Sequence, residues 1–202
     1  MKSILALVGL GLALAGCVNI GSQRETPPMQ YYVLSDPGAA ANSAAPRAES
    51  YAPTLLVFDT TAGSFYDTDQ LIFSRSENTR AQYQLARWTE RPGKGFTRLM
   101  RSRLEHHGSW HISAAGGHVR GDMLLDTELV EFYHDAASEP GQVRLVLRAE
   151  LFDLKQRKLL GRSVFERQIP VATYDAAGAA QASSQAVGRV LDDLTAWLAT
   201  FQ

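Results

Sequence analysis

The C-terminal half of the chain combines three long strand-like segments with one long amphipathic helix, and this combination restricts the fold most. Residues 122–133, 143–154 and 159–169 are rich in β-favouring residues and are joined by polar connections, the first of which contains Pro140-Gly141. Such connections are typical of hairpins. In residues 143–151, apolar side chains alternate with arginine and glutamate, which indicates a strand with one buried face. We therefore expect an antiparallel sheet.

A long helix is predicted over residues 175–201. Its charged side chains, which include Arg189, Asp192 and Asp193, lie opposite an apolar stripe at helical spacing. The stripe consists of Val187, Val190, Leu191, Leu194, Leu198 and Phe201. Because a helix cannot bury such a stripe alone, it is expected to lie across the sheet.

The N-terminal half predicts shorter elements. A helix is expected over residues 92–107, ending at Gly108, although Gly93 and Gly95 in its first turn each cost ~1 kcal/mol relative to alanine. Strands are expected over residues 31–35, 54–60, 70–74, 79–88 and 110–113, and Ala81, Tyr83 and Leu85 are expected on one face of the fourth. Together the elements predict an α+β fold: a two-layer sandwich of a mostly antiparallel sheet of about six to seven strands with two main helices, including the long C-terminal one.

The N-terminus has the pattern of a lipoprotein leader. A positive start and a short apolar stretch precede the tetrapeptide Leu-Ala-Gly-Cys, a lipobox whose Cys17 is the only cysteine of the chain. The thiol accepts diacylglycerol, and several acyl chains anchor firmly because each buried CH₂ contributes about 0.8 kcal/mol. We predict a signal peptide over residues 1–16 and lipidation at Cys17. Val18 stands where Asp would retain the lipoprotein in the inner membrane, which favours the outer membrane.

The rest of the chain divides into a tether and one domain. Residues 17–50 contain the lipidated cysteine, a polar, Pro- and Ala-rich tether and one short strand, and residues 51–202 are expected to form a single α+β domain. The 20 basic and 21 acidic side chains give a formal net charge of −1, which argues against nucleic-acid binding. A single cysteine excludes a multi-cysteine zinc or iron–sulfur site within the chain. No apolar run reaches the ~18 residues of a membrane-spanning helix.

A basic segment leads into the first predicted helix. Its six basic side chains, against Glu90 alone, are Arg87, Arg91, Lys94, Arg98, Arg101 and Arg103. Basic helix flanks attract anionic lipid headgroups or an acidic partner, and tryptophan and arginine are enriched at binding hot spots. We therefore predict partner binding by Arg87, Trp88, Arg98 and Arg101. The alternatives are a solvated helix flank and, for Trp88, a packing role at the end of a strand.

Two groups of polar side chains are candidates for metal or catalytic sites. His106, His107, His111 and His118 lie close in sequence, with Asp122 nearby. Such imidazoles could converge on zinc, but adjacent histidines at a helix end point in different directions and favour the negative end of the dipole. Asp59, Asp67 and Asp69 could be paired carboxylates, but their Gly-, Ser- and Asp-rich turn favours loop and cap roles. Because the mature chain also lacks a nucleophile elbow, a Walker A loop and a His-Glu-x-x-His motif, we expect no metal, no cofactor and no enzymatic activity.

Several features together resemble a known family. Tyr31-Tyr32-Val33-Leu34 follows the lipobox, residues 83–92 (YQLARWTERP) lead into a helix, Glu131-Phe132 ends a strand, and the terminal helix is Ala-rich and contains Trp197. On these features the chain resembles the ABC-type transport auxiliary lipoproteins of the paraquat-inducible protein C type. It departs from them at Thr89 and Arg91, where relatives usually read Trp-Ala-Glu-Pro.

The resemblance implies a non-catalytic lipoprotein of the outer membrane that faces the periplasm. It would act as the docking or scaffolding subunit of an ABC/MCE-type lipid transport system, with an MCE-domain protein and ABC or permease components as partners, and phospholipid and further copies of the chain as additional candidates. One alternative is a periplasmic carrier that encloses an acyl chain between helix and sheet; a remote one is an envelope hydrolase. An apolar cavity of ~300 Å³ or more would favour the carrier, and a filled core the scaffold.

Overall fold

The structure, a computed structural model, describes residues 28–39, 52–107, 109–117 and 119–201. Within these residues the chain forms one mixed sheet of nine strands and two helices, so the predicted α+β class is confirmed. The leader, Cys17 and most of the tether lie outside the described residues. None of the described helices is long and apolar enough to span a bilayer.

Three long strands make up the main layer of the sheet. They are β7 (Met123–Asp135), β8 (Gln142–Asp153) and β9 (Lys158–Pro170), which pair antiparallel in chain order as predicted. Alternate side chains of β8, including Leu145, Leu147 and Leu151, are completely buried. Gly141 precedes β8 with φ +81°, and a Cβ there would lie 2.1 Å from the carbonyl oxygen of Asp135, so this turn requires glycine.

The opposite edge of β7 is occupied by three short strands in succession. They are β2 (Thr54–Val57), β3 (Thr61–Ala62) and β4 (Gln70–Ser74), and each pairs parallel to a successive part of β7. The run predicted over residues 54–60 therefore ends as a strand at Val57, and the chain rejoins the sheet at Thr61. Because pairing along this edge is interrupted, the sheet has nine strands where six to seven were expected, and several of them are short.

Three further strands complete the sheet. β5 (Ala81–Trp88) pairs antiparallel to β4, β1 (Gln30–Tyr32) pairs parallel to β5, and β6 (His111–Ala114) pairs parallel to β2. The long strands contribute most of the paired residues, so the sheet is mostly antiparallel by residue although its short strands pair largely in parallel.

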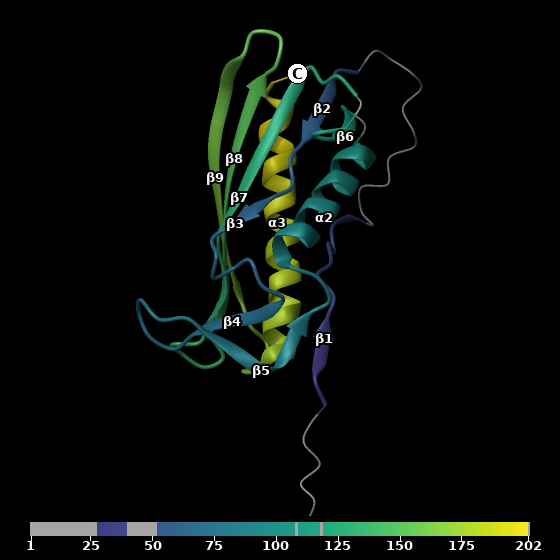
Figure 1. The fold of residues 1–202 in the computed structure, drawn as a ribbon. Coiled ribbons are helices and arrows are strands. Elements are labelled where there is room, and N and C mark those ends of the chain that lie inside the picture. The colour runs from purple at the N-terminus through teal and green to yellow at the C-terminus, as the bar shows by residue number, and fades with distance from the viewer. Residues whose placement is uncertain (1–27, 40–51, 108, 118, 202) are drawn as a thin grey trace, which may run out of the picture.

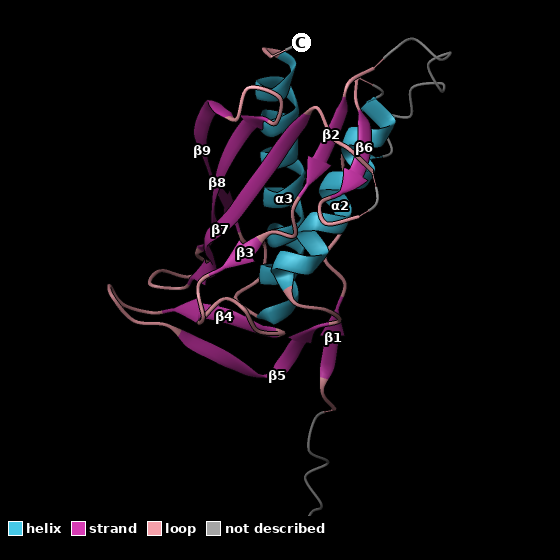
Figure 2. Ribbon diagram, turned by 45° about the horizontal axis from the view of Figure 1, so that its top comes forward, coloured by secondary structure: helices cyan, strands magenta, loops and turns pink. Residues whose placement is uncertain are grey.

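Two helices cover the sheet (Figures 1 and 2). α3 (Ala176–Ala199) runs along the face of β7, β8 and β9, and α2 (Pro92–His107) lies beside it near β2 and β6. Val187, Val190 and Leu194 are completely buried against the sheet, which confirms the predicted apolar stripe. The Asp175 carboxylate caps α3 by accepting a hydrogen bond from the Gly178 N–H at 2.7 Å.

The glycines in the first turn of α2 allow close packing. A Cβ on Gly93 would lie 2.8 Å from the carbonyl oxygen of Thr60. One turn later, the Thr97 hydroxyl accepts a hydrogen bond from the Thr60 N–H at 2.7 Å. Glycine destabilises this helix start, but it also lets α2 make a buried contact with the segment that joins β2 to β3.

One face assignment in the sequence analysis was wrong. Leu85 was expected on one face of the strand with Ala81 and Tyr83. In the structure Ala81 is exposed, Tyr83 is half-buried and Leu85 is 39% exposed. The buried residues of the strand are Ala86 and Trp88. The pairing of β4 with β5 slips between Gln70 and Ile72. This irregularity reverses the side-chain alternation along β5. At the end of the strand the even-numbered residues therefore face the core, where odd-numbered ones were expected.

A partly buried polar network ties β5 to the β7–β8 hairpin. The hydroxyl of Tyr83 and Nδ1 of His134 are 2.7 Å apart, and Nε2 of His134 lies 2.9 Å from the carbonyl oxygen of Pro140. Since a carbonyl only accepts, Nε2 carries a hydrogen, and in the neutral imidazole Nδ1 then accepts from the Tyr83 hydroxyl. Burial, together with the nearby Tyr174 and Asp175, raises the pKa of Tyr83 to about 12.

This network predicts a stability change at alkaline pH. An unfolded tyrosine ionises near pH ~10, below the pKa of about 12 in the folded chain, so the unfolded state loses its proton first and the free energy of unfolding falls between these pH values. For this partly exposed side chain we expect a loss of about 1–2 kcal/mol. Urea unfolding at several pH values should show that loss in the wild type and a smaller one in Tyr83→Phe. Parallel pH profiles would contradict the assignment.

Candidate functional site

The segment after β1 crosses over both helices. We call residues 33–38 the strap. The Ser35 N–H donates to the Ser184 hydroxyl at 3.2 Å, and a Cβ on Gly188 would lie 3.3 Å from both Oδ1 of Asp36 and Cδ of Pro37. Small side chains on α3 therefore let the strap lie directly against the helix.

A buried ion triad fixes the strap to both helices. Arg103 of α2 donates from Nε to Oδ2 of Asp36 at 2.8 Å and from Nη2 to Oδ1 of Asp36 at 2.5 Å, and it also donates to Oδ1 of Asp192 on α3. The side chains of Arg103 and Asp36 are 1% and 2% exposed, and that of Asp192 is 47% exposed. Burial alone would lower the pKa of Arg103, but the hydrogen bonds to Asp36 and Asp192 outweigh it and raise the pKa. Arg103 therefore stays charged.

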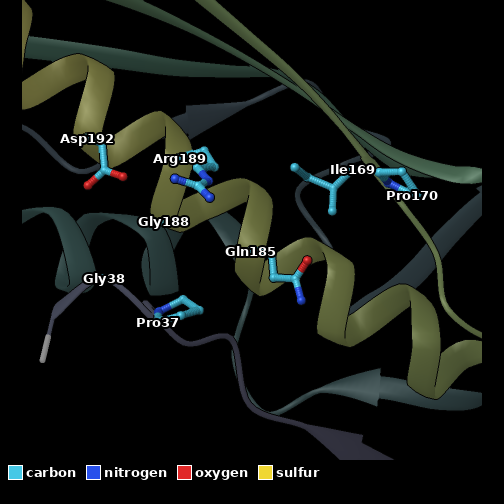
Figure 3. Close-up of a pocket in the computed structure, with 8 residues that line it drawn as sticks. All are labelled: Pro37, Gly38, Ile169, Pro170, Gln185, Gly188, Arg189 and Asp192. Carbon is cyan, nitrogen blue, oxygen red and sulfur yellow. The ribbon is translucent and has the colours of Figure 1, made fainter. Parts of the chain in front are cut away.

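The strap is bordered by surface hollows on both sides. Figure 3 shows one, of about 450 Å³, in which α3 passes between Pro37 of the strap and the end of β9 at Pro170. A second, of about 460 Å³, lies between the strap and the first turns of α3. Both are open to solvent, and small and polar side chains of α3, such as Gln185, line part of each beside Pro37 of the strap.

The arginines at the start of the basic segment pair with aspartates of the β3–β4 loop. Arg87 lies 2.8 Å from Asp69, and Arg91 lies 3.0 Å from Asp67. Trp88 is only 3% exposed and stacks on Phe132, with ring centroids 5.8 Å apart. The structure thus places Trp88 in the core, where it fills the packing role considered above.

Arg98 and Arg101 lie on the outer side of α2. Arg98 donates to Oε1 of Glu90 at 2.9 Å, and Arg101 donates to Oδ1 of Asp59 at 2.9 Å and to the carbonyl oxygen of Val57 at 2.7 Å. With the exposed Lys94 they border a hollow of about 450 Å³ that also contains Glu90, Asp59 and Glu105. This mixed-charge hollow, which we call the α2 hollow, brings together two of the four predicted partner-binding residues.

The aspartates weighed as paired carboxylates are instead the ionic partners of the basic segment, since Asp59, Asp67 and Asp69 each contact a different arginine. Of the histidines weighed as zinc ligands, His118 lies outside the described residues. Among the described residues, no group of three histidines, cysteines or carboxylates is placed to hold a metal ion.

The strap and its triad were not predicted from the sequence. Arg103 was counted with the basic flank, and Asp36 with the tether, because 67 residues separate them in sequence. One signal was present: Arg103 occupies a helical position in register with Met100 and Leu104, both buried. A charged residue on an apolar helix face indicates a buried ionic partner.

The fold and the strap define an α+β domain whose N-terminal segment is fastened across its two helices. The model of the family described as the ABC-type transport auxiliary lipoprotein component matches residues 32–195 of this chain. The chain therefore belongs to this family, and the resemblance drawn from the sequence is confirmed. Among curated proteins, none matches significantly.

Solved structures share the fold. Protein XCC0632 from Xanthomonas campestris has a TM-score of 0.72 and 20% identity, covering 84% of this chain and 94% of that one. An uncharacterized protein has a TM-score of 0.67 and 12% identity, covering 85% and 99%. The hypothetical protein CT253 from Chlamydia trachomatis has a TM-score of 0.53 and 9% identity, covering 73% and 96%. At such identities the likeness concerns the fold alone.

Proposed function

We propose that this auxiliary transport lipoprotein is the docking subunit of an MCE-type lipid transport system and has no catalytic role of its own. Lipidation at Cys17 anchors it in the envelope, with the domain facing the periplasm and the outer membrane as the anchoring bilayer. The family match, which describes an auxiliary lipoprotein component of ABC-type transport, is the observation that carries this proposal.

The packing between α3 and the sheet favours docking over the carrier alternative. Leu147, Leu151 and Leu191 are at most 1% exposed, so this interface is filled by closely packed side chains. The hollows of about 450 Å³ beside the strap and at α2 lie on the surface instead. A carrier needs an apolar space that shields an acyl chain from water, which open hollows lined partly by charged groups do not supply.

The α2 hollow is the proposed docking site. Its basic and acidic side chains are held in place by mutual contacts such as Arg98–Glu90, so their geometry is set before a partner arrives, which reduces the ordering cost of binding. Arg87 would extend this surface along β5, and Trp88 would support it from the core side by fixing the end of that strand.

Charge reversal should test the docking site. In the variant Arg98→Glu/Arg101→Glu, like charges face Glu90 and Asp59, and we expect co-purification of the MCE-domain protein from the envelope to fall at least about tenfold, as for loss of paired interfacial charges. Arg75→Glu/Arg157→Glu makes the same change in net charge at two exposed turns and should leave recovery unchanged. If recovery of the MCE-domain protein were unchanged in the first variant, at equal protein levels, the α2 hollow would not be part of the docking site.

A further inference from the structure

β9 forms a long free margin of the sheet. Among the described strands it pairs only with β8, and Figures 1 and 2 both place it at the outer side of the β7–β8–β9 layer. Alternate backbone N–H and C=O groups along this margin therefore have no partner strand. An open edge of this length is a template for pairing with another chain unless side chains oppose it.

The centre of β9 carries an exposed valine between opposite charges. Val164 is 56% exposed, whereas its neighbour Phe165 is buried on the α3 side and packs against Trp197 with ring centroids 6.0 Å apart. Because side chains alternate along a strand, Arg162 and Glu166 lie on the same outer face as Val164. Both are exposed. An apolar side chain of this exposure amid charged neighbours points to a partner surface.

The order of these three residues is self-complementary. In an antiparallel pair of two β9 strands with a two-fold axis at Val164, each Val164 lies opposite Val164 of the partner subunit. Arg162 then lies opposite Glu166 of the partner subunit, and the reverse contact forms by symmetry. Cross-strand pairs of opposite charge are stabilising in such ladders. On the α3 side, the same register places the small Ser163 opposite the large Phe165 of the partner subunit.

Contacts within the subunit already hold the two charges on this face. Nε of Arg162 lies 2.6 Å from Oε1 of Glu150, and Oε1 of Glu166 lies 3.1 Å from Nη2 of Arg144. Across the two-fold axis, negative and positive side chains would alternate. Glu150 and Arg162 of one subunit would be followed by Glu166 of the partner subunit and Arg144 of the partner subunit. An edge that only prevents aggregation carries like charges, commonly lysines, because these repel a second copy.

From this edge, its exposed valine and the symmetric charges, we infer that β9 is a homodimer interface: two copies of the chain join their sheets through antiparallel β9 strands centred on Val164. The two-fold axis is perpendicular to the sheet, so both copies present the same face to a bilayer lying parallel to it. One strand pair buries less than the ~1,200 Å² of a standard interface. The dimer is therefore weak in dilute solution and favoured where copies are concentrated on a membrane.

Single-cysteine crosslinking in cells that express the full chain tests this register. Val164→Cys places the two thiols directly opposite each other, so mild oxidation should yield a disulfide-linked dimer on non-reducing gels. In Arg162→Cys and in Glu166→Cys, each expressed alone, the two thiols are four residues out of register, about 13 Å apart, beyond disulfide reach. Neither should crosslink, but differently tagged Arg162→Cys and Glu166→Cys copies expressed together should. The wild type, which has only Cys17, controls for crosslinking elsewhere.

A charge exchange provides an independent check. In the Val164→Cys background, Arg162→Glu should reduce the dimer band several-fold. Adding Glu166→Arg should restore part of it, because opposite charges then face each other across the axis again, although each new side chain lies beside a like charge of β8. Equal crosslinking at all three positions, or none at Val164→Cys in protein present at wild-type levels, would overturn the interface. The readout requires no transport partner, and it is scored only on protein recovered in the membrane fraction, so failure here is distinct from failure of the proposed function.

Discussion

Arg103→Met should lower the free energy of unfolding by about 3–5 kcal/mol, the range for removing one member of a buried ion pair. The Asp36 side chain is 2% exposed, so without Arg103 its carboxylate would have to be desolvated with no compensating charge. The strap should then detach from α2 and α3, since this ion pair lies where the strap meets both helices. Urea denaturation followed by tryptophan fluorescence measures the stability loss.

The control for this prediction is the exposed acid of the same triad. The side chain of Asp192 is 47% exposed, so Asp192→Asn leaves no buried charge unpaired and should cost no more than about 1 kcal/mol. The double variant Arg103→Met/Asp36→Leu removes both buried charges and should recover part of the loss. If Arg103→Met were no more destabilising than Asp192→Asn, the triad would not be what holds the strap.

Cys17→Ala should release the protein from the membrane fraction and abolish incorporation of labelled palmitate. The expected effect is large because each buried CH₂ of a lipid contributes about 0.8 kcal/mol, so several acyl chains hold the protein firmly in a bilayer. Sedimentation of the envelope fraction and palmitate labelling measure the two outcomes.

Val18→Asp is the matched control for the anchor. It leaves Cys17 in place, so labelling should persist while the protein shifts from the outer to the inner membrane. Palmitate incorporation that persists in Cys17→Ala would show that the lipid is attached elsewhere, and a wild-type protein without label would remove the anchor from the account.

Much of the fold could be predicted because the segments that determine it show their side-chain pattern within the segment itself. The alternation in β8 and the apolar stripe of α3 depend only on side-chain periodicity, and both are confirmed by burial: Leu147 and Val190 are fully inaccessible. Parallel pairing of the short strands along β7 was not visible, because a two-residue strand such as Thr61–Ala62 carries no periodicity. The slip between β4 and β5 is also a property of the pair and not of either sequence.

The surface features were harder to predict because they depend on distant partners. The basic segment reads as an excess of positive charge along the chain, yet in space Arg87 is matched by Asp69 and Arg101 by Asp59. The excess of positive charge counted along the sequence is therefore larger than the excess in the folded protein, where aspartates from other segments balance part of it. The resemblance to the family, in contrast, was drawn from short segments that are each contiguous in sequence, such as residues 83–92, and the family match over residues 32–195 confirms it.

Photo-crosslinking from the α2 hollow tests the docking account most directly. Lys94 is exposed there. A photoreactive amino acid in its place, in the full chain within its native envelope, should capture the MCE-domain protein. The same photoreactive residue at the exposed Arg75 is the control that should not. Capture from Lys94 alone is the predicted result. If neither position captures the MCE-domain protein, or both do so equally, this lipoprotein does not dock to that transport system through α2.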